Sequence, residues 1–230
     1  LADEPLLQYT HVETGESHSL IDTERRYYYG NSQGAILGGG YLGLSPDIER
    51  AALGVGGTPY NLLLTRSYDF EPFFLVFKAM YPDPAEISLW LGLIQSIWDP
   101  AESSGYTPAL TREPIEGSSD KEILIQVAIG DAQVTTLGAE VMARAYDARM
   151  LAPTAREVWG LETVEESWEG SALVEFDYGL TEPFTNTPPD IDSDPHESPR
   201  RDRAGQDQID HFFRTGVVLQ TCTGICGETR

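Results

Sequence analysis

The chain has 230 residues, of which 40% are hydrophobic and 10% aromatic, so it can fold around a sizeable core. Fifteen Lys and Arg residues against 37 Asp and Glu residues give a formal net charge of −22. Such a surface repels nucleic acids and anionic membranes, which argues against a nucleic-acid function. No stretch approaches eighteen uninterrupted apolar residues, so the sequence predicts no transmembrane helix.

The predicted elements alternate between strands and helices after a polar segment at residues 1–25. This segment begins at Leu1 without an initiator Met or a leader pattern, which favours a processed or truncated start. The predicted strands are 25–29, 51–57, 122–130 and 171–179, and the predicted helices are 33–44, 136–148 and 204–216. This alternation predicts an α/β fold, in which a parallel sheet is covered by helices on both faces.

A long insertion, residues 58–120, separates two parts of the predicted catalytic core, 26–57 and 121–230. The best helix in the insertion covers residues 86–98. Its apolar side chains follow helical spacing, at Ile87, Trp90, Leu91, Ile94, Ile97 and Trp98. We expect a helical, cap-like insertion whose aromatic residues are mostly core, with a few lining the entrance to a site.

The pentapeptide Gly30-Asn31-Ser32-Gln33-Gly34 lies where a predicted strand ends and a predicted helix begins. The pattern Gly-x-Ser-x-Gly is typical of a nucleophile elbow, in which a sharp turn with a strained backbone exposes the serine hydroxyl. The predicted helix then directs its first N–H groups at developing negative charge. Ser32 is therefore the candidate nucleophile, and the backbone N–H of Gln33 is the candidate oxyanion donor.

A serine nucleophile needs a base, which is usually a histidine that a carboxylate orients. His196 is preferred because it lies in a loop after the last predicted strand, where open α/β sheets hold their sites. The other histidines are less suitable, because His11 and His18 precede the elbow and His211 lies within the last predicted helix.

Asp131 is the preferred carboxylate because it ends the strongest predicted strand, after a glycine and before a helix. A helix N-cap is its alternative role, and Asp177 is the rival carboxylate, although it lies within a predicted strand. The resulting order is Ser32, Asp131 and His196, which is the order of α/β-hydrolases.

The segments GNSQG, IGDAQV and DPHESPRR, in this order and each after a predicted strand, resemble the elbow, acid and histidine segments of the α/β-hydrolase superfamily. More narrowly, the chain resembles a group of exported bacterial serine hydrolases of the esterase and lipase type. In that group GNSQG precedes a small-residue helix, and the chain ends in a cysteine-bearing tail, here TGVVLQTCTGIC. The resemblance covers residue 25 to the C-terminus and implies a secreted or periplasmic location.

The resemblance also implies that part of the fold lies outside this chain. In α/β-hydrolases the elbow follows the fifth of eight strands, whereas only about thirty residues precede it here. The chain should then supply strands 5–8 and leave a central strand with an unpaired edge. We expect an N-terminal polypeptide from the same precursor to complete the sheet and to supply a second oxyanion donor; loss of these residues is the alternative.

Two further groups of residues have competing interpretations. Cys222 and Cys226 suit a small disulfide loop in an exported protein, with two free thiols as the alternative, and zinc would need more ligands than this pair. The segment that contains Asp190, Asp192 and Asp194 lacks the glycine and the glutamate that a calcium-binding loop requires. A solvated acidic loop is therefore favoured over a calcium site. The charges of these three carboxylates are expected to raise the pKa of His196.

The sequence therefore predicts a serine hydrolase that cleaves carboxylic esters through Ser32, His196 and Asp131, without a metal or an organic cofactor. The expected substrate is a small or lipid-like ester, since apolar residues dominate the insertion. An amidase or peptidase with the same triad is one alternative. A non-catalytic binding or assembly protein on a hydrolase scaffold is the other.

Overall fold

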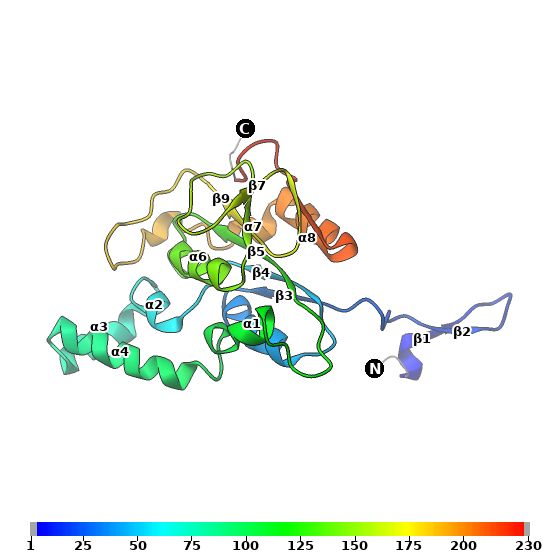
Figure 1. The fold of residues 1–230 in the computed structure, drawn as a ribbon, viewed down its shortest axis with the longest axis horizontal. Helices are drawn as coiled ribbons and strands as arrows, with labels where there is room; N and C mark the ends of the chain where they lie inside the picture. The colour runs from blue at the N-terminus through cyan, green and yellow to red at the C-terminus, as the bar shows by residue number, and fades with distance from the viewer. Residues whose placement is uncertain (1–3, 228–230) are drawn as a thin grey trace.

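The computed structural model describes residues 4–227 and has a parallel six-stranded sheet at its centre (Figure 1). The strand order is β3-β4-β5-β9-β6-β7, and every neighbouring pair is parallel. These strands are β3 (Tyr27–Asn31), β4 (Arg50–Gly54), β5 (Glu122–Ala128), β9 (Ala172–Phe176), β6 (Arg149–Leu151) and β7 (Thr163–Val164). The α/β prediction is confirmed. The sheet has six strands in place of the four expected, because β6 and β7 are too short to produce a pattern.

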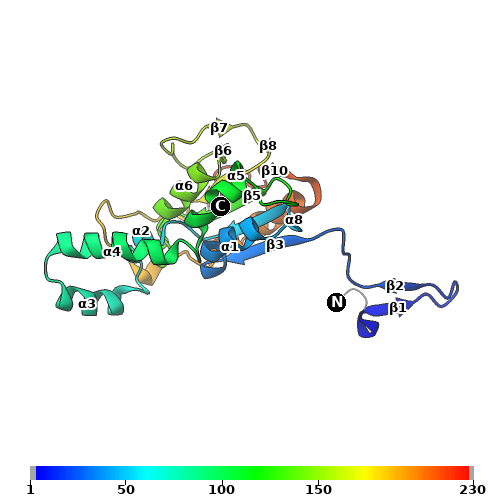
Figure 2. The same ribbon diagram turned by 60° about the horizontal axis from the view of Figure 1, so that its bottom comes forward.

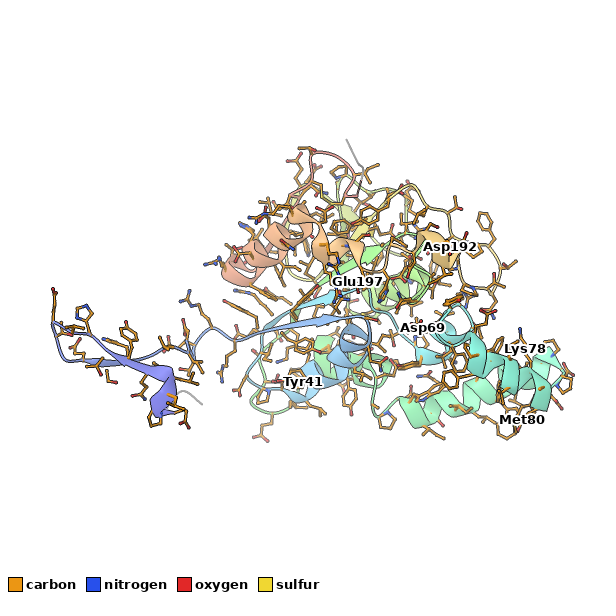
Figure 3. All side chains as sticks on the ribbon, turned by 180° about the vertical axis from the view of Figure 1, so that it is seen from behind. Tyr41, Asp69, Lys78, Met80, Asp192 and Glu197 are labelled. Atoms are coloured by element: carbon orange, nitrogen blue, oxygen red, sulfur yellow. A yellow bond between two sulfur atoms is a disulfide. The ribbon has the colours of Figure 1, made fainter. Side chains whose placement is uncertain are left out.

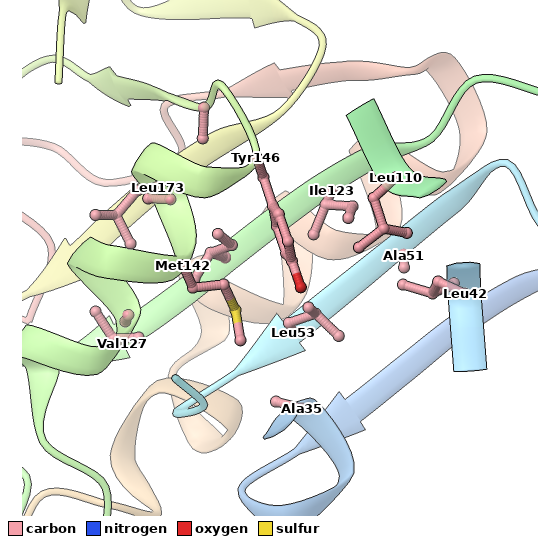
Figure 4. Packing of buried hydrophobic residues seen from close by; sticks show 14 of the residues in the cluster. Ala35, Leu42, Ala51, Leu53, Leu110, Ile123, Val127, Met142, Tyr146 and Leu173 are labelled. Carbon is pink, nitrogen blue, oxygen red and sulfur yellow. The ribbon is translucent and has the colours of Figure 1, made fainter. Parts of the chain in front are cut away.

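Each face of the sheet carries its own apolar core, and the side chains of β5 alternate between the two. Ile123 and Ile125 pack with α1 (Gln33–Leu44) and α6 (Thr136–Ala145), in the cluster that Figure 4 shows around Met142. Leu124 belongs to the opposite cluster, with residues of α8 (Arg203–Thr215). Successive side chains of a strand point to opposite faces of the sheet, so both faces of this apolar strand need helices to cover them.

The glycines of α1 allow the helix to lie close to its neighbours. A Cβ atom at Gly38 would stand 2.8 Å from the Tyr28 ring, and one at Gly39 would stand 2.4 Å from Ser103 Oγ. The Gly39 N–H donates a hydrogen bond to that hydroxyl at 3.1 Å. These glycines therefore serve close packing, and α1 is thereby fixed beside β3, which leads into it.

The insertion between β4 and β5 forms a helical layer of its own. Its elements are α2 (Tyr60–Leu64), α3 (Glu71–Met80), α4 (Pro84–Trp98), η2 (Ser103–Tyr106) and α5 (Thr107–Thr111). Figure 2 shows that α3 and α4 form a hairpin projecting away from the sheet. Ile87 and Leu91 are buried, but Ile97 is 74% exposed and Phe73 is 67% exposed. The aromatic residues of the hairpin are half-buried or exposed, and Trp90 is 40% exposed, so the expectation that most of them are core is wrong.

The N-terminal segment forms an arm that extends from the body of the protein (Figure 1). It contains η1 (Pro5–Leu7) and an antiparallel pair, β1 (Gln8–Thr10) and β2 (Ser17–Ser19). The arm leads into β3, which lies at one edge of the six-stranded sheet. Within residues 4–227, β4 is the strand that pairs with β3. In the same range, no helix is long and apolar enough to cross a membrane.

The C-terminal part closes the other face of the sheet. After η3 (Ile191–Ser193) come α7 (Ser198–Arg201), α8 and β10 (Val217–Leu219), and β10 pairs with β8 (Ser167–Glu169). Helix α8 ends at Thr215, and the next residue, Gly216, has a φ of 78°, which suits a glycine that stops a helix. Cys222 and Cys226 form a disulfide, so the predicted pairing is confirmed.

Candidate active site

Ser32 lies at the junction of β3 and α1 with an unusual backbone conformation. Its φ of 56° and ψ of −122° place it in a region that non-glycine residues rarely adopt. The Ser32 N–H donates to the Gly54 carbonyl at 2.8 Å, and its own carbonyl accepts from the N–H groups of Ala35 and Ile36. The residue is therefore held between the end of β4 and the first turn of α1, as a nucleophile elbow requires.

The two glycines of the pentapeptide differ in how strictly the turn requires them. A Cβ atom at Gly30 would lie 2.3 Å from the Gly34 carbonyl oxygen, a distance that forces the turn apart. A Cβ atom at Gly34 would meet only the Tyr28 hydroxyl, at an ordinary 3.8 Å. The turn therefore excludes a side chain at Gly30, whereas Gly34 has room for a methyl group.

The Gln33 N–H is available for an incoming oxygen atom. Gln33 is the first residue of α1, and the first N–H groups of a helix have no partner within it. Among the described residues, no acceptor takes this N–H in a hydrogen bond. The Gln33 side chain is fixed separately, because its Oε1 accepts a hydrogen bond from the Tyr60 hydroxyl at 2.6 Å.

His196 and Asp131, which are 65 positions apart in the sequence, form a buried pair. His196 Nδ1 lies 2.8 Å from Asp131 Oδ2, and the residues are 3% and 1% exposed. The other carboxylate oxygen of Asp131 accepts from the N–H groups of Gln133 and Val134, at 2.8 and 2.9 Å. Asp131 thus fixes the turn after β5 and holds the imidazole, but it is not a helix N-cap, because α6 begins at Thr136 with Thr135 as its N-cap.

Asp194 joins the loop of His196 to the turn of Asp131. Its Oδ1 accepts from the N–H groups of Ala132 and His196, at 3.0 and 3.2 Å, and its Oδ2 accepts from the Gln133 side chain at 2.7 Å. The expectation of a solvated acidic loop is therefore wrong for this residue. Asp194 is followed by a proline and lies two residues before His196. This arrangement is an Asx-turn signal, which indicates that the Asp194 side chain accepts a hydrogen bond from the His196 N–H.

Opposing effects act on the imidazole of His196, and their sum raises its pKa. Burial disfavours the charged ring, but the hydrogen bond and the charge of Asp131 outweigh it, with help from the charges of Asp194 and Glu197. Of the three carboxylates expected to raise this pKa, Asp194 does so, whereas Asp190 and Asp192 are not among the causes. Burial also raises the pKa of Asp131, and its hydrogen bonds from His196, Val134 and Gln133 oppose that rise.

Ser32 lines a hollow of about 210 Å³ together with the turn that follows Asp131. The hollow is bounded by Ser32 and Gln33 on one side and by Gln133 and Val134 on the other. Gln133 and Val134 donate their N–H groups to Asp131, so they belong to the turn that holds this carboxylate. The turn at Ser32 and the turn after Asp131 therefore line the same hollow. No hydrogen bond joins Ser32 to His196 among residues 4–227, and the residues that line this hollow do not include His196 or Asp131.

The other sequence candidates lie elsewhere. The Asp177 side chain accepts from the Gly179 N–H and lines a separate, larger hollow of about 570 Å³. His18 belongs to the N-terminal arm, where His11 also lies, and His211 belongs to α8. The larger hollow contains charged side chains, such as those of Arg66 and Arg156, and Ser32 does not line it. No cluster of potential metal ligands occurs among the described residues.

The raised pKa of His196 predicts how the activity of a Ser32 enzyme would depend on pH. The imidazole must be neutral to accept the serine proton, so kcat/KM is expected to rise with pH around a midpoint above 6.5. Asp194→Asn removes a nearby negative charge and should lower the midpoint. Asp190→Asn, in the same loop, is the control and should leave it unchanged. The pH profile of p-nitrophenyl ester hydrolysis at constant ionic strength measures the midpoint in both variants. Equal shifts of the midpoint in the two variants would contradict this explanation.

Comparisons with family models, curated proteins and solved structures found no match to this chain. The function is therefore inferred from the geometry of the site.

Proposed function

We propose that the protein is a serine hydrolase that cleaves carboxylic esters, with Ser32 as nucleophile, His196 as base and Asp131 as the orienting acid. The observation that carries the proposal is the strained backbone of Ser32 at a strand-to-helix turn. The buried pair of His196 and Asp131 supports it, because Asp131 belongs to the turn that bounds the same hollow. All three residues follow strands of the parallel sheet, which is where such folds place their sites.

In the proposed reaction, Ser32 Oγ attacks the ester carbonyl carbon while His196 Nε2 takes the hydroxyl proton. The oxyanion receives a hydrogen bond from the Gln33 N–H, and the imidazolium then gives the proton to the departing alcohol. Water attacks the acyl-enzyme by the reverse proton transfers and releases the carboxylic acid. Asp131 holds the Nδ1–H tautomer and stabilises the imidazolium that forms in both steps.

A fluorophosphonate probe tests this proposal, since it phosphonylates an activated serine. The wild-type protein should be labelled, and Ser32→Ala should lose both the label and the hydrolysis of p-nitrophenyl esters. Ser67→Ala is a matched control, because Ser67 lines the same hollow and should remain dispensable. Absence of label from the wild type would favour a non-catalytic scaffold, and faster cleavage of p-nitroanilides than of esters would favour an amidase or peptidase.

We further propose that the edge of β3 receives a strand from another polypeptide. β3 pairs with β4 alone among the described strands, and an open edge invites a further strand. Helix α1 also exposes three apolar side chains one turn apart, Leu37, Tyr41 and Leu44. Native mass compared with a denaturing gel tests the idea, and a single polypeptide in the native protein would contradict it. The disulfide supports the expected export from the cytoplasm.

A further inference from the structure

The hairpin of α3 and α4 contains an apolar groove of about 230 Å³. Its walls include Val76, Phe77 and Met80 from α3, together with Leu91 and Ile94 from α4. All the residues that line it are apolar, so a charged or strongly polar ligand would lose its hydration there without gaining a partner. The groove therefore suits a hydrocarbon.

The groove adjoins the hollow that holds Ser32. Phe70, the residue before α3, lines both. Tyr60 of the Ser32 hollow also meets Trp98 of the groove, with ring centroids 5.4 Å apart. Because the Tyr60 hydroxyl donates to the side chain of Gln33, this aromatic contact links the groove to the residue beside the nucleophile.

The direction of the groove follows from the position of the hairpin. Figure 3 shows Asp69 near the base of the hairpin, beside the body of the protein, and Met80 at its outer end. Asp69 lines the Ser32 hollow, whereas Met80 lines the groove. A ligand with a polar end at Ser32 and an apolar tail would therefore extend from the body of the protein along the hairpin.

We propose that this groove binds a long hydrocarbon chain of the ester substrate while the ester group lies at Ser32. The inference rests on the proposed function and narrows its substrate class to esters with an extended alkyl arm. Each methylene that moves from water into an apolar site contributes about 0.8 kcal/mol, or about fourfold in binding. The chain-length preference should therefore continue as the chain enters the hairpin.

Two series of esters test the proposal, one lengthening the acyl arm of p-nitrophenyl esters from acetate to octanoate and one lengthening the alcohol arm of alkyl acetates. All concentrations stay below those at which the esters aggregate. One of the series should show kcat/KM rising at least a hundredfold across the added methylenes. A flat response in both series, with acetate esters still cleaved, would overturn the groove assignment while leaving the hydrolase intact.

Two substitutions on the same helix separate the groove from the general surface of the hairpin. Val76 and Leu75 are both 61% exposed, but only Val76 lines the groove. Val76→Asp should reduce the ratio of long-chain to short-chain kcat/KM at least tenfold. Leu75→Asp should change that ratio less than twofold. Equal losses in the two variants would show that the outer apolar surface, by contact with lipid or aggregates, causes the preference, and would overturn the proposal.

A binding measurement keeps the test independent of catalysis. Calorimetric titration of the Ser32→Ala variant with 1-octanol should detect binding, which Val76→Asp should weaken at least fivefold and Leu75→Asp should not. If the wild-type protein does not cleave esters but this pattern of octanol binding is observed, the proposed function alone is refuted. Absence of octanol binding, or equal weakening by both substitutions, would refute the groove.

Discussion

Asp131→Asn is expected to lower kcat for ester hydrolysis about ten-thousandfold with a small change in KM. An asparagine can still accept the N–H groups of Gln133 and Val134 through its carbonyl oxygen, so the turn after β5 should keep its shape. Its amide would then donate to His196 Nδ1. The imidazole proton would move to Nε2, and His196 could no longer accept a proton from Ser32.

Asp177→Asn is the matched control for this prediction. Asp177 follows β9 as Asp131 follows β5, but its carboxylate accepts the Gly179 N–H and does not contact His196. Steady-state kinetics should therefore show a change of no more than a fewfold, and thermal unfolding should show that both variants fold. A larger loss of kcat in Asp177→Asn than in Asp131→Asn would reverse the assignment of the carboxylate.

The turn at Ser32 and the position of Asp131 after β5 could be predicted because each follows a strong local pattern. Ser32 stands in a glycine-flanked turn, and Asp131 follows the most apolar strand. Parallel strands end at one edge of a sheet, so these local predictions also imply that the residues approach each other. His196 followed from the position of its loop relative to the last strand of the core.

The role of Asp194 and the exposure of the hairpin could not be predicted from such patterns. Asp194 acts by bonding Ala132 and Gln133, so its role depends on two distant loops meeting. Similarly, the spacing of Ile87, Leu91 and Ile97 predicts an apolar helix face but does not say what covers it. In the fold, the same face contributes Leu91 to the buried part and Ile97 to the exposed part.

Arg156→Met is expected to lower the free energy of unfolding by about 3–5 kcal/mol, a large part of the 5–15 kcal/mol typical of proteins. Arg156 binds Glu175 through two hydrogen bonds, of 3.1 and 2.9 Å, and also contacts Glu182 and Glu140. The Glu175 side chain is only 1% exposed. Loss of the guanidinium would leave the negative charge of Glu175 in an apolar strand without a partner.

Urea unfolding measures this change, and two further variants identify its cause. Arg203→Met breaks an exposed pair with Asp207 and should cost no more than about 0.5 kcal/mol. Arg156→Met combined with Glu175→Met should recover most of the loss, because it removes the stranded charge.

The pH dependence of stability provides a separate test of whether the unpaired charge of Glu175 causes this loss. Burial already raises the pKa of Glu175, and Arg156 opposes that rise. Without Arg156 the folded-state pKa moves further above 4.5, so the folded protein binds more protons than the unfolded chain between the two pKa values. Stability then falls as pH rises through this range. The deficit of Arg156→Met relative to wild type should therefore be larger at pH 7 than at pH 5, and a deficit independent of pH would indicate lost packing instead.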